Sequence, residues 1–136
     1  MSEDSDFEVR INSSHDESIA RVTDALKSEG FGVLTRIDID QAFKEKIGAD
    51  FRPYTILGAC NPKLAHAALS SNPEIGLMLP CNVTVEATDS GSLVRFTDPS
   101  MMMQMGNLKT DEVISGVAVD AAERLKRVAV SLNELS

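Results

Sequence analysis

The chain has 136 residues, of which 43% are hydrophobic and 25% charged, as in an ordinary globular domain with one core. Its 13 basic residues are outnumbered by 21 acidic residues, and the formal charge of -8 repels nucleic-acid backbones. Aromatic residues make up 4%, too few for a base-stacking platform, and no stretch has the roughly 18 apolar residues of a membrane span. We therefore expect a soluble, cytoplasmic protein that contacts neither nucleic acid nor membrane.

The first residues divide into a leader and the start of a domain. Residues 1–6 are acidic and predict a disordered leader, and a single domain is expected over 7–136. Apolar and polar residues alternate over 7–12, which is the period-two pattern of a strand with one buried face. Ser14 with a glutamate three residues later is typical of a capping box, so a helix is predicted there with His15 at its surface.

A second strand and a second helix are expected next along the chain. Alternation over 33–37 predicts the strand, after which Asp40 can cap a short helix. Phe43 and Ile47 are expected to face inward from that helix. The apolar run over 54–59 then predicts a short, well-buried strand.

A third helix is predicted to follow this buried strand directly. Cys60 falls at the end of the strand, Asn61 is a suitable N-cap, and Pro62 suits the first helical position, where its missing N–H costs nothing. The predicted inner face of the helix consists of Leu64, Ala65, Ala68 and Leu69. We expect the strand to hand over to the helix at Cys60.

The last part of the sequence predicts a long strand, a hairpin partner and a terminal helix. Apolar residues at every second position over 77–87 predict one strand in which Cys81 faces the core. Pro80 cannot donate to a sheet, so an edge, a bulge or a break is expected there. A partner strand over 93–97 and a long helix from about residue 111 complete an α+β domain with about five strands, mainly antiparallel.

The two cysteines leave a reactive and a structural interpretation open. A cysteine before a helix N-terminus can have a lowered pKa, so Cys60 is a candidate nucleophile with Cys81 as its resolving partner. Free cysteine is also a common buried apolar residue. Four methionines over 101–105 carry thioethers, which are soft ligands of the kind copper(I) prefers, but methionines more commonly serve as packing. His66 is expected to be exposed to solvent and not to bind a metal. No complete catalytic, metal or cofactor motif is present, so we assign none and leave enzymatic activity open.

A resemblance adds to this reading. The run GFGVLTRIDIDQAFKEKIGADFRPYTILGACNPKLAHAAL, followed by PEIGLMLPCNVTVE, closely resembles the bacterial and archaeal domain of unknown function 302 family. The resemblance covers nearly the whole chain, and its most specific parts are 58–62 and 79–81. It implies an α+β fold like that of the TATA-box-binding protein, with a curved antiparallel sheet, helices on one face, and often a homodimer, but not DNA binding. Its signature residues fall on Cys60, Asn61, Pro62, Pro80, Cys81, Asp98 and Pro99.

We therefore expect a binding or interaction module that forms a homodimer and recognises a small ligand or a protein partner. The residues predicted to form its site are Gly58, Cys60, Asn61, Pro62, Pro80, Cys81, Asn82 and Asp98. A thiol-dependent enzyme or redox sensor that uses Cys60 and Cys81 is the rival hypothesis. Metal carriage by sulfur ligands is the third.

Overall fold

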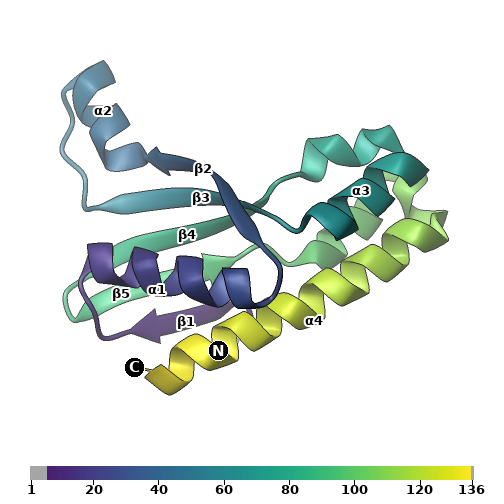
Figure 1. Cartoon of the computed structure of the whole chain (residues 1–136). Helices are drawn as coiled ribbons and strands as arrows, with labels where there is room; N and C mark the ends of the chain where they lie inside the picture. Colours follow the sequence, from purple (N-terminus) through teal and green to yellow (C-terminus); the bar gives the residue numbers. More distant parts are fainter. Residues whose placement is uncertain (1–5, 136) are drawn as a thin grey trace.

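Five antiparallel strands form one sheet, and α1 and α4 cover one of its faces (Figure 1). The computed structural model describes residues 6–135, so residues 1–5 of the predicted leader lie outside the described part. The strands are β1 (Glu8–Ile11), β2 (Gly32–Asp38), β3 (Tyr54–Cys60), β4 (Cys81–Thr88) and β5 (Gly91–Phe96). The helices are α1 (His15–Ser28), α2 (Ile39–Ile47), α3 (Pro62–Ser71) and α4 (Glu112–Leu135), with 3₁₀ turns η1 (Pro73–Met78), η2 (Pro99–Gln104) and η3 (Gly106–Thr110). The predicted α+β class is confirmed, and the architecture is compatible with a fold like that of the TATA-box-binding protein.

The sheet order is β1-β5-β4-β3-β2, so β2 is an edge strand. Because residues directly opposite one another point to the same face, the register defines a row of side chains across the sheet. That row consists of Val9, Val94, Val85, Thr55 and Asp38. The row is apolar on β1, β5 and β4 and polar on β3 and β2. A hydrophilic site can therefore form beside the core at β3 and β2.

The main core lies between the sheet and the two long helices. From α1 it takes the predicted stripe of Ile19, Val22 and Leu26, and from α4 it takes Leu125, Val128 and Leu132. Ser14 caps α1 by accepting a hydrogen bond from the Glu17 N–H at 3.2 Å, as the capping-box pattern predicts. The chain leaves α1 at Gly30, whose φ of 86° suits glycine.

A second, smaller core lies beyond the end of the sheet at which β3 leads into α3. It is built from α3, the three 3₁₀ turns and the first half of α4, and its buried members include Ala68, Ile75, Leu108 and Ile114. Cys81 belongs to it, as expected for a core-facing residue. The methionine-rich segment packs here through Met102, with Met103 and Met105 partly buried, so these side chains serve as packing in the described structure.

α2 departs from its predicted packing. Phe43 and Ile47 were expected to face inward, but α2 has no buried residue and Ile47 is 74% exposed, because α2 projects away from the sheet (Figure 1). The predicted N-cap, Asp40, lies inside the first turn instead, and the helix begins after Asp38. Asp40 Oδ1 accepts a hydrogen bond from the Tyr54 N–H at 3.1 Å and thereby ties α2 to β3.

The long strand predicted over 77–87 begins only at Cys81. Asn72 caps a 3₁₀ turn over η1 by accepting the Glu74 N–H, and Leu77 is 78% exposed, so its place in the alternating pattern was coincidental. Pro80 lies at the predicted break, just before β4 begins. Leu69, predicted to lie on the inner face of α3, is also exposed. Among residues 6–135, no helix combines the length and apolar character needed to cross a membrane.

Candidate functional site

The predicted site residues on β3 and β4 lie close together, but close packing holds several of them. Gly58 faces Thr35 and Pro80, and a Cβ at this position would overlap Thr35 Oγ1 and lie 2.8 Å from Pro80 Cγ. Only glycine fits there without displacing its neighbours. Gly58 therefore permits β2 and Pro80 to approach β3.

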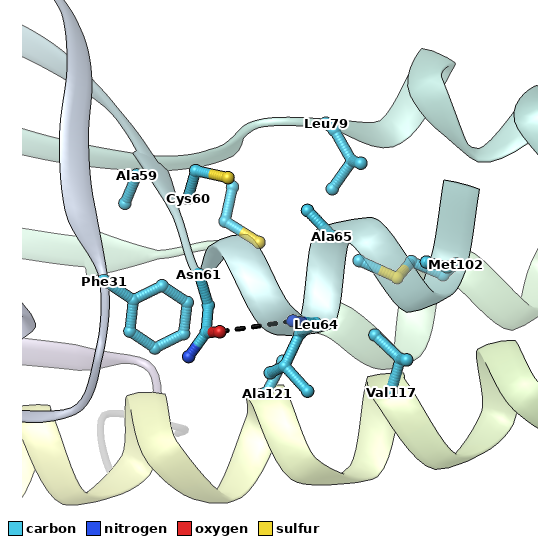
Figure 2. A pocket seen from close by; sticks show the side chains of 12 residues that line it. Phe31, Ala59, Cys60, Asn61, Leu64, Ala65, Leu79, Met102, Val117 and Ala121 are labelled. Atoms are coloured by element: carbon cyan, nitrogen blue, oxygen red, sulfur yellow. Dashed lines mark hydrogen bonds between the residues drawn. The ribbon is translucent and has the colours of Figure 1, made fainter. Parts of the chain in front are cut away.

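Asn61 fulfils the predicted capping role. Its Oδ1 accepts a hydrogen bond from the Leu64 N–H at 3.2 Å, which caps α3 (Figure 2). Its Nδ2 donates to the Glu29 carbonyl at 3.4 Å. Both ends of the buried amide thus bind backbone groups of the protein itself. Asn61 joins α3 to the end of α1 and is occupied by that structural role.

Cys60 and Cys81 are free thiols that line one small cavity, together with Leu79, Ala65 and Phe31 (Figure 2). The cavity has a volume of about 20 Å³, which is room for one molecule the size of water. Cys81 lies directly opposite Ala59, the residue before Cys60, so the end of β3 and the start of β4 bring the two thiols to the same cavity.

The acid-base state of Cys81 also bears on the thiol hypothesis. Burial, and to a smaller extent the neighbouring Cys60, raises the pKa of Cys81 to about 11. The thiolate is the nucleophilic form of cysteine, so Cys81 is a weak nucleophile at neutral pH. This is the opposite of the lowered pKa that reactive cysteines have.

The other predicted site residues surround this region without entering the cavity. Pro62, Pro80 and Asn82 are exposed. Asp98 caps η2 by accepting the Ser100 N–H at 2.9 Å, so one of its carboxylate oxygens is engaged in the turn. Residues 58–62 and 80–82 thus form a surface around a water-sized cavity.

A larger polar cavity lies beside the junction of β2 and α2. This junction is at the left of the sheet in Figure 1. The volume of the cavity is about 370 Å³, within the range of small-molecule sites. We call it the His15 cavity; it is lined by Ser14, His15, Asp16, Arg36, Asp38, Asp40, Gln41 and Pro53. Three segments therefore contribute to it: the start of α1, the β2–α2 junction and the residue before β3.

A hydrogen-bonded network anchors the His15 cavity in the sheet. His15 Nε2 lies 3.1 Å from the Val85 carbonyl oxygen and 3.3 Å from Thr55 Oγ1. A carbonyl oxygen only accepts, so Nε2 carries the proton and donates. Thr55, which is fully buried, donates in turn to Asp38 Oδ1 at 2.8 Å. His15 was expected at the surface, but it is half-buried because its ring reaches the Val85 carbonyl on β4 and Thr55 on β3.

The carboxylates of the cavity are held in defined positions. Asp38 Oδ1 also accepts from Arg36 Nε at 3.1 Å, and the hydrogen bond from Thr55, more than the pairing with Arg36, lowers the pKa of Asp38. Asp38 is therefore ionised at neutral pH. Asp40 is fixed by its bond to the Tyr54 N–H. In the part of the chain that the structure describes, no three His, Cys, Asp or Glu side chains are grouped so that they could hold a metal ion.

The sequence held one signal for this site. Thr55 is a hydroxyl residue inside an otherwise apolar run, and a buried hydroxyl needs a partner. The sequence does not indicate which residue is that partner, because the pairing of Thr55 with Asp38 and Val85 depends on strand register. His15, Thr55 and Asp38 come together from positions 15, 55 and 38 only in the folded sheet.

Comparison with known proteins places the chain beside uncharacterised relatives. The family profile described as "Domain of unknown function DUF302" matches residues 7–132. A crystal structure of an uncharacterized conserved DUF302 protein from Bacillus stearothermophilus is similar, with 30% sequence identity and a TM-score of 0.80. The similarity covers 91% of this chain and 94% of that one. No curated protein matches the chain.

Proposed function

The chain belongs to the DUF302 family, whose description names no activity, and we propose that it binds a small polar ligand in the His15 cavity. The observation that carries the proposal is a cavity of about 370 Å³ whose polar wall is fixed to the sheet by the His15–Thr55–Asp38 network. Binding sites of this kind combine adequate volume with a few polar groups held in place before the ligand arrives.

Binding without catalysis is favoured by the state of the nearby hydroxyl groups. Thr55 is fully buried and donates a hydrogen bond to Asp38, so it has no access to a substrate. The Ser14 hydroxyl accepts the Glu17 N–H as a helix cap. The Ser14 hydroxyl is thus engaged as a cap, and Thr55, although it is hydrogen-bonded to the Asp38 carboxylate, is not exposed to a substrate that it could attack.

The surface over 58–62 and 80–82 suits a different role from the His15 cavity. Its cavity of about 20 Å³ is too small for an organic ligand, so we retain this surface as a proposed contact with a protein partner. The rival function, thiol chemistry through Cys60 and Cys81, finds less support because burial raises the pKa of Cys81 to about 11.

A ligand-observed NMR screen of small polar molecules tests the proposed function. We expect hits for the wild-type protein that are lost in Gln41→Trp, a variant in which a large side chain at the cavity wall fills the space. Ser90→Trp is the matched control, since it places the same ring at another exposed position that lines a separate depression. Hits that persist in Gln41→Trp and disappear in Ser90→Trp would contradict the assignment.

We also propose that two copies associate through β2 and α2, in a reducing compartment such as the cytoplasm. β2 is an edge strand with Leu34 68% exposed, and the neighbouring α2 exposes Ile47. Edge strands that carry apolar residues favour pairing with another chain, and antiparallel pairing of identical edges has two-fold symmetry. Free thiols at Cys60 and Cys81 are typical of a reducing compartment.

Light scattering coupled to size-exclusion chromatography tests the association. The wild-type protein is expected to have the mass of a dimer. The variants Leu34→Lys and Ile47→Lys are each expected to have the mass of a monomer. Val130→Lys, at an exposed apolar residue of α4, is expected to leave the dimer intact. A monomeric wild-type protein, or dissociation only by Val130→Lys, would refute the proposed interface.

A further inference from the structure

Resting on the proposed function, we infer that the ligand of the His15 cavity is an organic cation with N–H donors, such as a diamine. The carboxylates of Asp16, Asp38 and Asp40 only accept hydrogen bonds, whereas the Ser14 hydroxyl and the Gln41 amide can both donate and accept. A ligand that supplies several N–H donors matches this surface. A ligand that offers only acceptors places its oxygens against the oxygens of the cavity and forms no hydrogen bonds with them.

The charge of the lining points the same way. Asp16, Asp38 and Asp40 supply three carboxylates, and Arg36 supplies one guanidinium, which is already bonded to Asp38 at 3.1 Å. With His15 counted as neutral, two negative charges are left uncompensated by the other lining residues. The formal charge of the whole chain, -8, adds a long-range field that favours cations.

His15 adds a directional acceptor to these charges. Its Nε2 proton is directed to the Val85 carbonyl and Thr55, so the neutral ring keeps its lone pair on Nδ1. In imidazole the two nitrogens diverge, and Nδ1 is therefore turned away from the bonds that fix the ring. A ligand ammonium or amine can donate to it, whereas an anionic ligand cannot.

The spread of the acceptors distinguishes an organic cation from a metal ion. Among the described residues, the carboxylates and His15 are not grouped closely enough to ligate one metal ion. They are instead distributed around about 370 Å³ of space. A molecule with two separated cationic ends can reach acceptors on both sides, from Asp16 on α1 to Asp40 on α2.

Two features of the cavity favour an anionic ligand instead. They are the Arg36 guanidinium and the backbone amides at the start of α1. Arg36 is paired with Asp38, and Asp16 and Glu17 already place negative charge in the first turn of α1. Both attractions for an anion are thus compensated within the chain. We therefore expect discrimination against carboxylates and phosphates.

Three probes of similar length and different charge test the inference: 1,4-diaminobutane, 1,4-butanediol and succinate. Each is titrated into ¹⁵N-labelled protein at pH 7 and low ionic strength, and amide shifts are followed. We expect 1,4-diaminobutane alone to shift the amides of residues 14–16 and 36–41. We further expect 0.3 M NaCl to weaken its binding, because salt screens charged contacts.

Charge variants supply the matched control. Asp40→Asn keeps an oxygen for the Tyr54 N–H and is expected to weaken diamine binding about fivefold, as is Asp16→Asn. Asp24→Asn removes the same charge from an exposed position of α1 about 12 Å along the helix from Asp16, and it is expected to change affinity less than twofold. Equal weakening by Asp24→Asn and Asp40→Asn would overturn the inference, since general charge and not the cavity would then explain binding.

The three probes separate failure of the inference from failure of the proposed function. Shifts at the cavity amides caused by butanediol or succinate, with none from the diamine, would overturn the cationic ligand and leave a polar binding site in place. Absence of shifts at these amides with all three probes would overturn the inference and remove the support for the His15 cavity as a binding site.

Discussion

Replacing Thr55 with valine removes the hydroxyl that links His15 to Asp38 while keeping the size of the side chain. Thr55 is fully buried and its 2.8 Å hydrogen bond goes to an ionised carboxylate. Hydrogen bonds to charged groups contribute about 1.5–3 kcal/mol, and Asp38 is partly exposed, so we expect Thr55→Val to lower the free energy of unfolding by about 2 kcal/mol at pH 7. Urea denaturation followed by circular dichroism measures this loss.

The pH dependence identifies the partner of the hydroxyl. The bond from Thr55 lowers the pKa of folded Asp38, so its stabilisation is present above the pKa of the unfolded carboxyl, about 3.9, and is lost as the pH falls through the folded pKa. The difference between wild type and Thr55→Val should therefore shrink in acid. An NMR titration should also find the pKa of Asp38 raised in the variant.

Thr84 provides a matched control on the neighbouring strand. Its buried Oγ1 has no hydrogen-bond partner in the described structure, so Thr84→Val is expected to leave stability unchanged or to raise it by up to about 1 kcal/mol. An equal loss of stability in Thr55→Val and Thr84→Val, or an Asp38 pKa that does not move in Thr55→Val, would refute the network.

Three further predictions concern the residues around the smaller cavity. Gly58→Ala should destabilise the fold by about 2 kcal/mol in urea denaturation, because its Cβ meets Thr35 and Pro80, whereas Gly116→Ala, with open space around it in α4, should be neutral or stabilising; equal effects would contradict the close packing. Asn61→Ala should cost about 1 kcal/mol through loss of the α3 cap, and Asn61→Ser, which keeps an acceptor and places no charge beside the Glu29 carbonyl, should cost less; the reverse order in the same assay would contradict the capping role. Cys81, 5% exposed and with a pKa of about 11, has about one thiolate in ten thousand molecules at pH 7, so iodoacetamide followed by mass spectrometry should label Cys60 first; labelling of Cys81 as fast as Cys60 would revive the thiol hypothesis.

Local signals in the sequence predicted local structure well. The capping box at Ser14, the cap at Asn61 with Pro62 behind it, and the inward position of Cys81 all depend on neighbours within a few residues, and the structure confirms each of them. The break at Pro80 follows from its missing N–H in the same way.

Predictions failed where tertiary context decides the outcome. α2 carries an apolar stripe, but it projects beyond the sheet, so Ile47 is 74% exposed in the described chain. Leu77 matched the period of the following strand, yet the cap at Asn72 turned that segment into a 3₁₀ turn. Periodicity indicates which face is apolar and does not indicate whether a surface is available to cover it.

The His15 cavity could not be derived because its parts are joined by strand register. His15 looked like an ordinary residue in a capped first turn, and its buried partners, Thr55 and the Val85 carbonyl, lie on two strands far along the chain. Asp38 becomes part of the same row only through pairing of β2 with β3. The two cysteines, in contrast, are easily noticed in the sequence because the chain has no others. The cavity beside them has a volume of only about 20 Å³, which is too small for an organic ligand.

A crystallographic fragment screen with small polar compounds tests the proposed function most directly. Electron density for fragments is expected between Asp16 on α1 and Asp40 on α2, in contact with His15. Fragments that settle on other surfaces, while the His15 cavity contains only water, would contradict the assignment of this cavity as the ligand site.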